Sequence, residues 1–206
     1  MGQEVRCVGR MGREAGEGRA YLGSDRVTFR GAFRLDIPFT EIRTIEAKEG
    51  ALALSFVGGK AVFDLGEAAA KWAEKIRNPK SLLDKLGVTP QSRLCVIGVD
   101  DESFLADLTR RVGAFRLGRP SAKEDIIFFA ADTEAELVRL DALKGRLEAD
   151  GALWVVSKKG KAATIKDVQV MACAKTAGLV DTKVASFSAT HTALKLVIPK
   201  AARSRS

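Results

Sequence analysis

Apolar and polar residues alternate in short segments over the first third of the chain. The turn sequences GSD, RGA, KEG and VGGK separate these segments, and a period of two is typical of half-buried strands. Six strands are predicted: Arg19–Leu22, Arg26–Phe29, Phe33–Pro38, Ile42–Ala47, Ala51–Phe56 and Ala61–Leu65. Strands at this spacing, with no helix among them, predict an antiparallel meander that closes as a roll or small barrel.

A helical pattern follows Gly66 in the segment EAAAKWAEKIRN. Its apolar residues fall on one face, and Trp72 is expected to close one open end of the roll. The sequence Asn78-Pro79-Lys80 ends this helix, because the residue before a proline is biased away from helical geometry. We therefore predict one domain over residues 1–79 and a second over residues 80–206.

The second part contains RLCVIG (93–98), a continuous apolar run typical of a strand buried on both faces. Gly98 permits a tight turn, and Asp100 or Asp101 can cap the helix that follows. Strands then alternate with helices, which predicts a mostly parallel sheet. The last two strands are joined only by SATH, so they must form an antiparallel hairpin. The predicted elements are strands 93–98, 114–117, 125–131, 152–157, 179–187 and 192–198 and helices 101–112, 133–148 and 165–177.

Three resemblances accompany these patterns. The run RVTFRGAFRLDIPFTEIRTIEAKEGALALSF and the helix AAKWAEKI resemble bacterial pleckstrin-homology-like and GRAM-like domains, which bind lipids, peptides or proteins, or brace a neighbouring domain. The segments RLCVIG, EDIIFFAADTEAELVRL and LEADGALWVVSKKG resemble the Rossmann-like fold of S-adenosylmethionine-dependent methyltransferases. The segments KLGV, VIGVDD, DGALWVVSKKG and SFSATHTALK resemble a bacterial family of uncharacterised Rossmann-like proteins over about residues 81–199, and that family implies no activity.

The methyltransferase resemblance implies S-adenosylmethionine as cofactor, held by a glycine-rich loop and an acidic residue on the second strand. The loop here keeps only Gly98, and Arg116 and Arg119 stand where the carboxylate is expected. The usual contacts of the cofactor are therefore missing. A phosphate ligand is disfavoured as well, because carboxylates occupy the start of the next helix. The candidate cofactor-binding residues that remain are Gly98, Asp100, Asp101, Asp132 and Lys158.

His191 is the only histidine of the chain. If the predicted topology holds, it lies at the edge of the sheet where Gly98 and Asp100 also lie, and it could transfer protons there together with Asp100. The alternative is a hydrogen-bonded structural residue in a tight turn. The sequence offers no CxxC pair, no second histidine and no GxSxG motif, so no metal site is predicted.

The net charge of +8 is uneven along the chain. Residues 1–79 carry 13 basic and 11 acidic residues, whereas residues 80–206 carry 21 and 15. The second half has basic clusters at Arg110/Arg111/Arg116/Arg119, Lys158/Lys159/Lys161 and Lys200/Arg203/Arg205. These clusters are compatible with nucleic-acid or ribonucleoprotein contact. The alternative is a solvated surface with a basic tail, since no aromatic residues interleave with the clusters.

Location and function follow from these patterns. No apolar run reaches about 18 residues, and the N-terminal segment lacks the apolar core of a signal peptide. Cys7, Cys95 and Cys173 are expected to be buried free thiols. We therefore expect a cytoplasmic protein.

The first hypothesis for the function is a non-catalytic binding or scaffold protein with a degenerate methyltransferase-like domain and a nucleic-acid or protein partner. The alternative is a methyltransferase or small-molecule sensor that uses Gly98, Asp100 and His191. A lipid-recruited adaptor is disfavoured by the near-neutral first domain.

Overall fold

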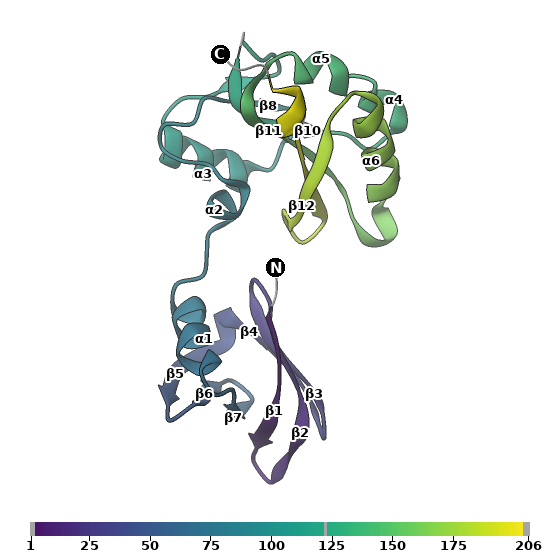
Figure 1. The fold of residues 1–206 in the computed structure, drawn as a ribbon. Coiled ribbons are helices and arrows are strands. Elements are labelled where there is room, and N and C mark those ends of the chain that lie inside the picture. The colour runs from purple at the N-terminus through teal and green to yellow at the C-terminus, as the bar shows by residue number, and fades with distance from the viewer. Residues whose placement is uncertain (1–2, 122, 204–206) are drawn as a thin grey trace. The chain divides into compact units, whose positions relative to one another are not determined.

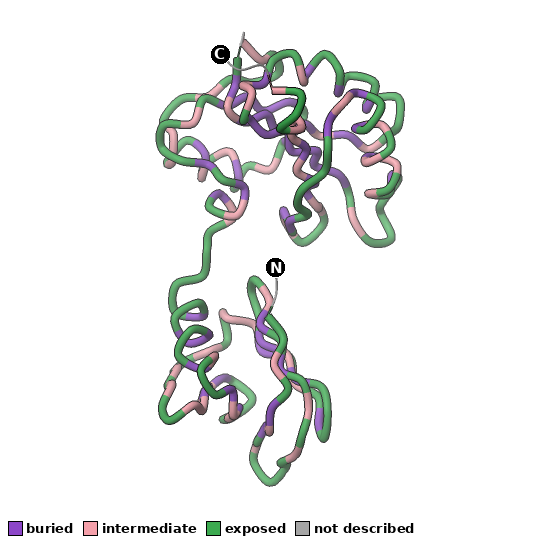
Figure 2. The backbone as a smooth tube through the Cα atoms, in the orientation of Figure 1, coloured by how far each residue is buried: buried purple, intermediate pink, exposed green. Residues whose placement is uncertain are grey.

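The computed structural model describes residues 3–121 and 123–203, and the chain divides into two units, Met1–Ser81 and Leu82–Ser206 (Figure 1). Buried residues form a separate hydrophobic interior within each unit (Figure 2). None of the helices in the described parts of the chain is both long and apolar enough to cross a membrane.

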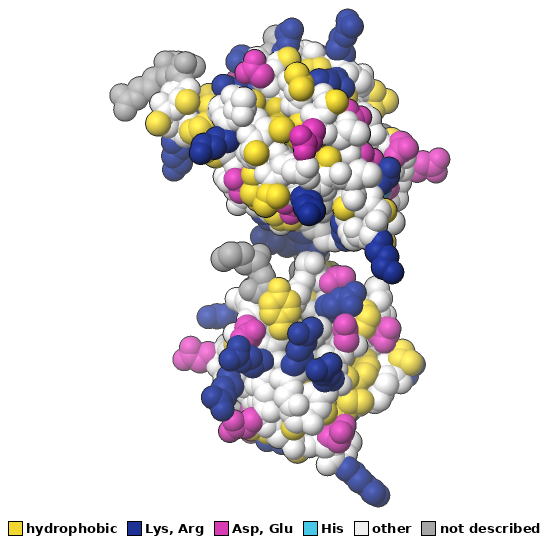
Figure 3. All heavy atoms as spheres, turned by 90° about the vertical axis from the view of Figure 1, so that its right-hand side faces the viewer, with side chains coloured by type: hydrophobic (Ala, Val, Ile, Leu, Met, Phe, Trp, Pro, Cys, Tyr) yellow, Lys and Arg dark blue, Asp and Glu magenta, His cyan; other side chains and the backbone are white. Residues whose placement is uncertain are grey.

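The first unit is a single antiparallel sheet of seven strands in the order β4-β3-β2-β1-β7-β6-β5. The strands are β1 (Gln3–Met11), β2 (Glu14–Leu22), β3 (Arg26–Gly31), β4 (Arg34–Pro38), β5 (Ile42–Lys48), β6 (Ala51–Phe56) and β7 (Gly59–Asp64), with a 3-10 turn η1 (Phe39–Glu41). Six of them match the predicted segments, but β1 was not predicted. Because β1 joins β2 to β7, it holds the two halves of the sheet together. Outward-facing positions carry many charged side chains (Figure 3).

In the middle of this sheet, the ring of Phe29 packs closely over Gly9 and Gly18. A Cβ atom on Gly18 would lie 2.4 Å from Cζ of Phe29, and one on Gly9 would lie 2.8 Å from the same atom. The ring of Phe29 therefore covers backbone that has no side chain of its own, an arrangement that stabilises glycines in strands. Phe29 is fully buried, and its ring centroid lies 4.7 Å from that of Phe33 and 5.7 Å from that of Phe63.

Helix α1 (Ala68–Arg77) packs on β5 and β6. Its buried residues, Ala69, Trp72, Ala73 and Ile76, recur at the spacing of one helix face, as the sequence predicted. Trp72 is 1% exposed and belongs to the core of this unit.

The second unit has one sheet of six strands in the order β12-β13-β11-β10-β8-β9. Its elements are α2 (Leu82–Leu86), β8 (Leu94–Ile97), α3 (Glu102–Val112), β9 (Arg116–Leu117), β10 (Glu124–Ala130), α4 (Glu134–Leu137), α5 (Leu140–Lys144), β11 (Leu147–Lys158), η2 (Gly160–Ala162), α6 (Asp167–Thr176), β12 (Val180–Ser186), β13 (His191–Val197) and η3 (Lys200–Ala202).

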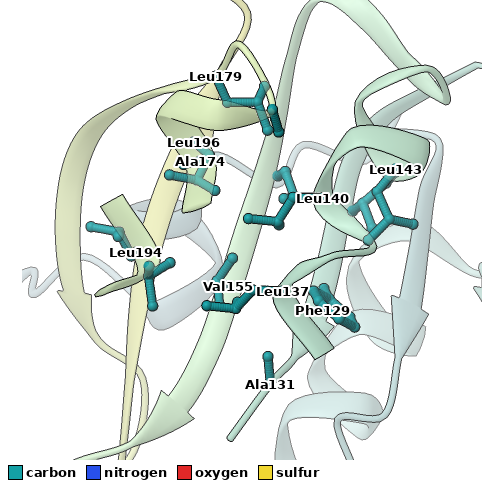
Figure 4. Packing of buried hydrophobic residues seen from close by; sticks show 14 of the residues in the cluster. Phe129, Ala131, Leu137, Leu140, Leu143, Val155, Ala174, Leu179, Leu194 and Leu196 are labelled. Atoms are coloured by element: carbon teal, nitrogen blue, oxygen red, sulfur yellow. The ribbon is translucent and has the colours of Figure 1, made fainter. Parts of the chain in front are cut away.

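Helices cover both faces of this second sheet. On one face, Leu137 of α4, Leu140 of α5 and Ala174 of α6 pack against inward-facing residues of the strands (Figure 4). On the other face, α2 and α3 contribute Leu83, Phe104 and neighbouring apolar residues to a separate cluster. The central strands are consequently buried on both sides, which explains their continuous apolar runs.

The predicted fold class was wrong. Over the described residues, eight of the eleven strand pairings are antiparallel and 27% of residues are helical, so the structure is mainly an antiparallel, curled sheet and not a mostly parallel Rossmann-like one. The sheet of the first unit is entirely antiparallel, because its connections are too short for crossovers. Strands β4 and β5 are the two edges of this sheet. The predicted pleckstrin-like roll is not confirmed. In the second unit the predicted helix 133–148 is divided into α4 and α5, and the sheet is mixed.

The three cysteines are free. Cys7 and Cys95 are buried as expected, whereas Cys173 is only half-buried. Burial raises the pKa of the Cys95 thiol to about 11, and the nearby charge of Glu124 adds to this effect. A thiol with so high a pKa is a poor nucleophile, and Cys95 is therefore a core residue.

Replacing Phe29 by alanine should lower the free energy of unfolding of the first unit by about 3 to 5 kcal/mol, because the change opens a cavity over Gly9 and Gly18. Urea unfolding monitored by the fluorescence of Trp72, in a Trp154→Phe background, measures this change. The control is Tyr21→Ala, since Tyr21 is 42% exposed and its loss should cost less than about 1 kcal/mol. Equal costs for the two variants would contradict the packing role of Phe29.

Candidate functional site

Three neighbouring strands of the second unit end at one edge of the sheet. The register pairs Ile97 of β8 with Phe129 of β10, and Ala130 of β10 with Val156 of β11, with all three strands parallel. Gly98 follows β8 with a φ of 71°, in the left-handed region that favours glycine, and it turns the chain toward α3. The carboxyl ends of these strands, where open sheets commonly bind ligands, thus lie side by side.

A cavity of about 310 Å³ opens at this edge. It brings together all six residues that the sequence proposed for a site: Gly98, Asp100, Asp101, Asp132, Lys158 and His191. Apolar side chains complete the lining: Val99, Ala130, Val156 and Phe187. Convergent polar groups on an apolar wall are typical of small-molecule sites.

Asp101 and Asp100 have different roles, although they are adjacent. Asp101 is the N-cap of α3, and its Oδ1 accepts hydrogen bonds from the backbone N of Phe104 at 3.0 Å and from Oγ of Ser103 at 2.7 Å. These two hydrogen bonds lower the pKa of Asp101 below its ordinary value, and the bond from Phe104 has the larger effect. Asp100 is exposed and accepts no hydrogen bond from the residues that the structure describes. Its carboxylate is therefore available to a ligand.

Asp132 and Lys158 form an ion pair across the cavity wall. Nζ of Lys158 lies 2.8 Å from Oδ2 of Asp132, and the backbone N of Lys158 donates to Oδ1 at 3.2 Å. This pairing lowers the pKa of Asp132 and raises that of Lys158. The turn after Asp132 is fixed by Glu136, whose Oε2 accepts from the backbone N atoms of Asp132 and Thr133, both at 2.9 Å.

His191 is the first residue of β13 and lies opposite Lys158 in the strand register. Its Nδ1 is 2.9 Å from Oγ1 of Thr190 and 3.5 Å from Oγ of Ser188, and its backbone N donates to the same Ser188 oxygen at 3.1 Å. The ring is half-buried and held by one nitrogen. Among the described residues, none hydrogen-bonds to Nε2, which leaves that atom for a ligand or a proton.

The cavity favours positive charge. Three carboxylates line it against one ammonium group, so the lining carries a net negative formal charge at neutral pH. An anionic ligand would be repelled, whereas an ammonium or sulfonium group would be attracted. Within the described ranges, no group of three His, Cys, Asp or Glu side chains is placed to hold a metal ion.

The basic clusters proposed for nucleic-acid contact are largely occupied by internal partners. Arg110 pairs with Asp107, Arg111 with Asp84 at 2.8 Å, and Arg116 with Glu124 at 3.7 Å, while Nζ of Lys159 donates to Ser186 and Ser188. In the tail, Arg203 donates to the carbonyl of Ile198, and Arg205 lies outside the described residues.

Sequence reasoning missed Lys195, which lines a second cavity of about 350 Å³ at the opposite edge of the sheet. Burial lowers the pKa of Lys195, and the nearby Lys183 lowers it further. Its Nζ lies 5.9 Å from the ring centroid of Trp154. The available signal was a single lysine between Leu194 and Leu196 in the otherwise apolar run ALKLVI.

Residues 122–200, less than half of the chain, match a family model described as a protein of unknown function, DUF3052. This agrees with the expected similarity to an uncharacterised family, over a shorter range than predicted. No curated protein matches the chain.

Solved structures with similarity include S-adenosylmethionine-dependent methyltransferases. One from Aquifex aeolicus is 14% identical, with 59% of this chain and 90% of that chain covered and a TM-score of 0.47. Magnesium protoporphyrin IX methyltransferase from Synechocystis is also 14% identical, with 57% and 74% covered and a TM-score of 0.43. The C-terminal domain of an unknown protein from Leishmania infantum is 13% identical, with 37% and 80% covered and a TM-score of 0.33. Similarity at this level assigns neither an activity nor a ligand.

Replacing Asp101 by alanine should destabilise the second unit by about 0.5 to 2 kcal/mol, because α3 loses its N-cap. The adjacent Asp100→Ala should change stability by less than about 0.5 kcal/mol. Urea unfolding followed by Trp154 fluorescence, in a Trp72→Phe background, compares the two variants.

The cost of Asp101→Ala should also depend on pH. Because folding lowers the pKa of Asp101, its stabilisation is present above the ordinary aspartate pKa of about 3.9 and is lost as the pH falls through the lower folded value. The difference between wild type and Asp101→Ala should therefore shrink in acid. A difference that grew in acid would contradict the capping role.

Proposed function

We propose that the second unit binds a small organic cation in the cavity at the carboxyl edge of its parallel strands. The observation that supports this most directly is the cavity itself, where Asp100 accepts no hydrogen bond from the described residues and the lining carries excess negative charge. Its volume of about 310 Å³ is near the lower limit of about 300 to 1,000 Å³ for ligand sites, so the ligand is small or only partly enclosed.

Binding without chemistry is the proposed role, in keeping with the hypothesis of a non-catalytic binding protein. Asp132 and Lys158 would shape the wall, Asp100 would meet the cationic group, and Nε2 of His191 would offer a hydrogen bond. If the ligand undergoes a reaction, His191 and Asp100 are the groups able to move a proton.

S-Adenosylmethionine fits this cavity only in part. Its ammonium and sulfonium charges suit the carboxylates. Its ribose, however, would need a carboxylate on the strand next to β8, and β9 there offers Arg116, which faces Glu124. Methyl transfer therefore remains the alternative function, and the compound is a useful probe.

Thermal unfolding with S-adenosylmethionine, S-adenosylhomocysteine and a panel of amines and quaternary ammonium compounds tests the proposal. A ligand at about 100 times its dissociation constant adds about 2.7 kcal/mol to stability and raises the melting temperature by several degrees. Cationic compounds should produce this shift, and neutral analogues of the same shape should produce less.

Asp100→Asn should weaken binding of the cation about tenfold or more, since a hydrogen bond to a charged group contributes about 1.5 to 3 kcal/mol. Its melting temperature without ligand should be equal to that of wild type or slightly higher, since the variant removes a carboxylate that lies near two others. Asp181→Asn, an exposed change on β12 away from the cavity, is the charge-matched control. A shift that survives in Asp100→Asn and Asp132→Asn, or no shift with any cation, would refute the proposal.

A further inference from the structure

The outer face of the first sheet carries a row of four arginines. The strand register places Arg6 of β1 opposite Arg19 of β2, Arg19 opposite Arg30 of β3, and Arg30 opposite Arg34 of β4. All four are exposed, whereas Cys7, Ala20 and Phe29, each next to one of them in sequence, are buried. Lys and Arg side chains are seen to gather on one face of this unit in Figure 3.

This arrangement is unfavourable for the isolated protein. Adjacent strands are about 4.8 Å apart, so four positive charges fall along roughly 14 Å. Like charges on directly opposed positions of a sheet destabilise it. Nη2 of Arg6 reaches Glu17 at 2.8 Å and Nη1 of Arg19 reaches Glu4 at 3.1 Å, but both pairs are exposed and such pairs contribute little. Arg30 and Arg34 form no ion pair with any residue that the structure describes.

An aromatic ring stands beside the row. Tyr21 is 42% exposed and lies on the same outer face of β2, two residues from Arg19. Its cross-strand neighbours are Glu4 and Thr28, so no bulky apolar side chain lies directly opposite the ring on either adjacent strand. A basic track with an adjacent aromatic platform is the combination that binds unpaired nucleotides.

We propose that this face of the first unit binds single-stranded nucleic acid. The arginine row contacts the phosphates, and Tyr21 stacks on a base. Carboxylates limit the partner to something narrow: Glu4 and Asp36 lie on one side of the row, and Glu17 lies on the other. A flat anionic membrane would press its headgroups against these carboxylates, whereas a single strand follows the arginines between them.

Fluorescence anisotropy of the full chain with a short labelled oligothymidylate, at salt concentrations from about 50 to 200 mM, tests this proposal. Each lost phosphate contact reduces the slope of log affinity against log salt by about 0.7 on single strands, so Arg30→Gln with Arg34→Gln should reduce it by about 1.4. The matched control is Lys71→Gln with Lys75→Gln, which removes two exposed charges from α1. Its slope should stay near that of wild type.

Tyr21→Leu should weaken binding about fivefold or more without changing the salt slope, because stacking releases no counterions. The arginine variant should melt at or above the wild-type temperature, since it relieves repulsion, and this separates lost binding from lost folding. Equal binding by the arginine variant and its control would overturn the proposal, as would an unaffected Tyr21→Leu. The proposal would also be overturned if the arginine variant lost tight binding to anionic vesicles but kept its binding to the oligonucleotide.

Discussion

The parallel register of β8, β10 and β11 is the constraint on which the second unit depends. Backbone hydrogen bonds align the three strands so that they end together, and apolar side chains on both faces keep them buried. Gly98 can then turn the chain with a positive φ, which places the start of α3 beside the ends of β10 and β11. Without this alignment, Asp100, Asp132 and His191 would have no common edge.

Local patterns predicted the segments well and their assembly poorly. The continuous run at β8 and the face of α1 that contains Trp72 follow directly from side-chain periodicity. Strand β1 was missed although Val5, Cys7 and Met11 alternate with charged residues. Its signal is weak because Gly9 takes the place of one inward-facing side chain, and its pairing with β2 and β7 establishes it as a strand. Strand order and direction depend on contacts between distant residues. The predicted fold class was therefore wrong. The placement of the candidate site residues at strand ends depended only on local turns, such as the one at Gly98, and the structure contains these turns.

Charge counts were a poor guide to charged surfaces. The basic second half uses Arg111, Arg116 and Lys158 to neutralise carboxylates within its own unit. The nearly balanced first half instead aligns arginines across four strands. A sum over a segment cannot distinguish these cases, because the distance between charges is set by strand register and not by sequence separation. The alternation within each strand does indicate which charges share a face, but the register had to come from the structure.

Both proposals rest on charges that the fold does not use. Asp101 caps a helix and Asp132 holds Lys158, so folding alone explains these two carboxylates. Asp100 adds negative charge to the same cavity and accepts no hydrogen bond from the described residues. On the first sheet, Arg30 and Arg34 add positive charge and form no ion pair with a described residue. Uncompensated charge placed next to like charge costs stability. An external partner of opposite charge removes that cost, and its chemistry follows from the sign and spacing of the groups it meets.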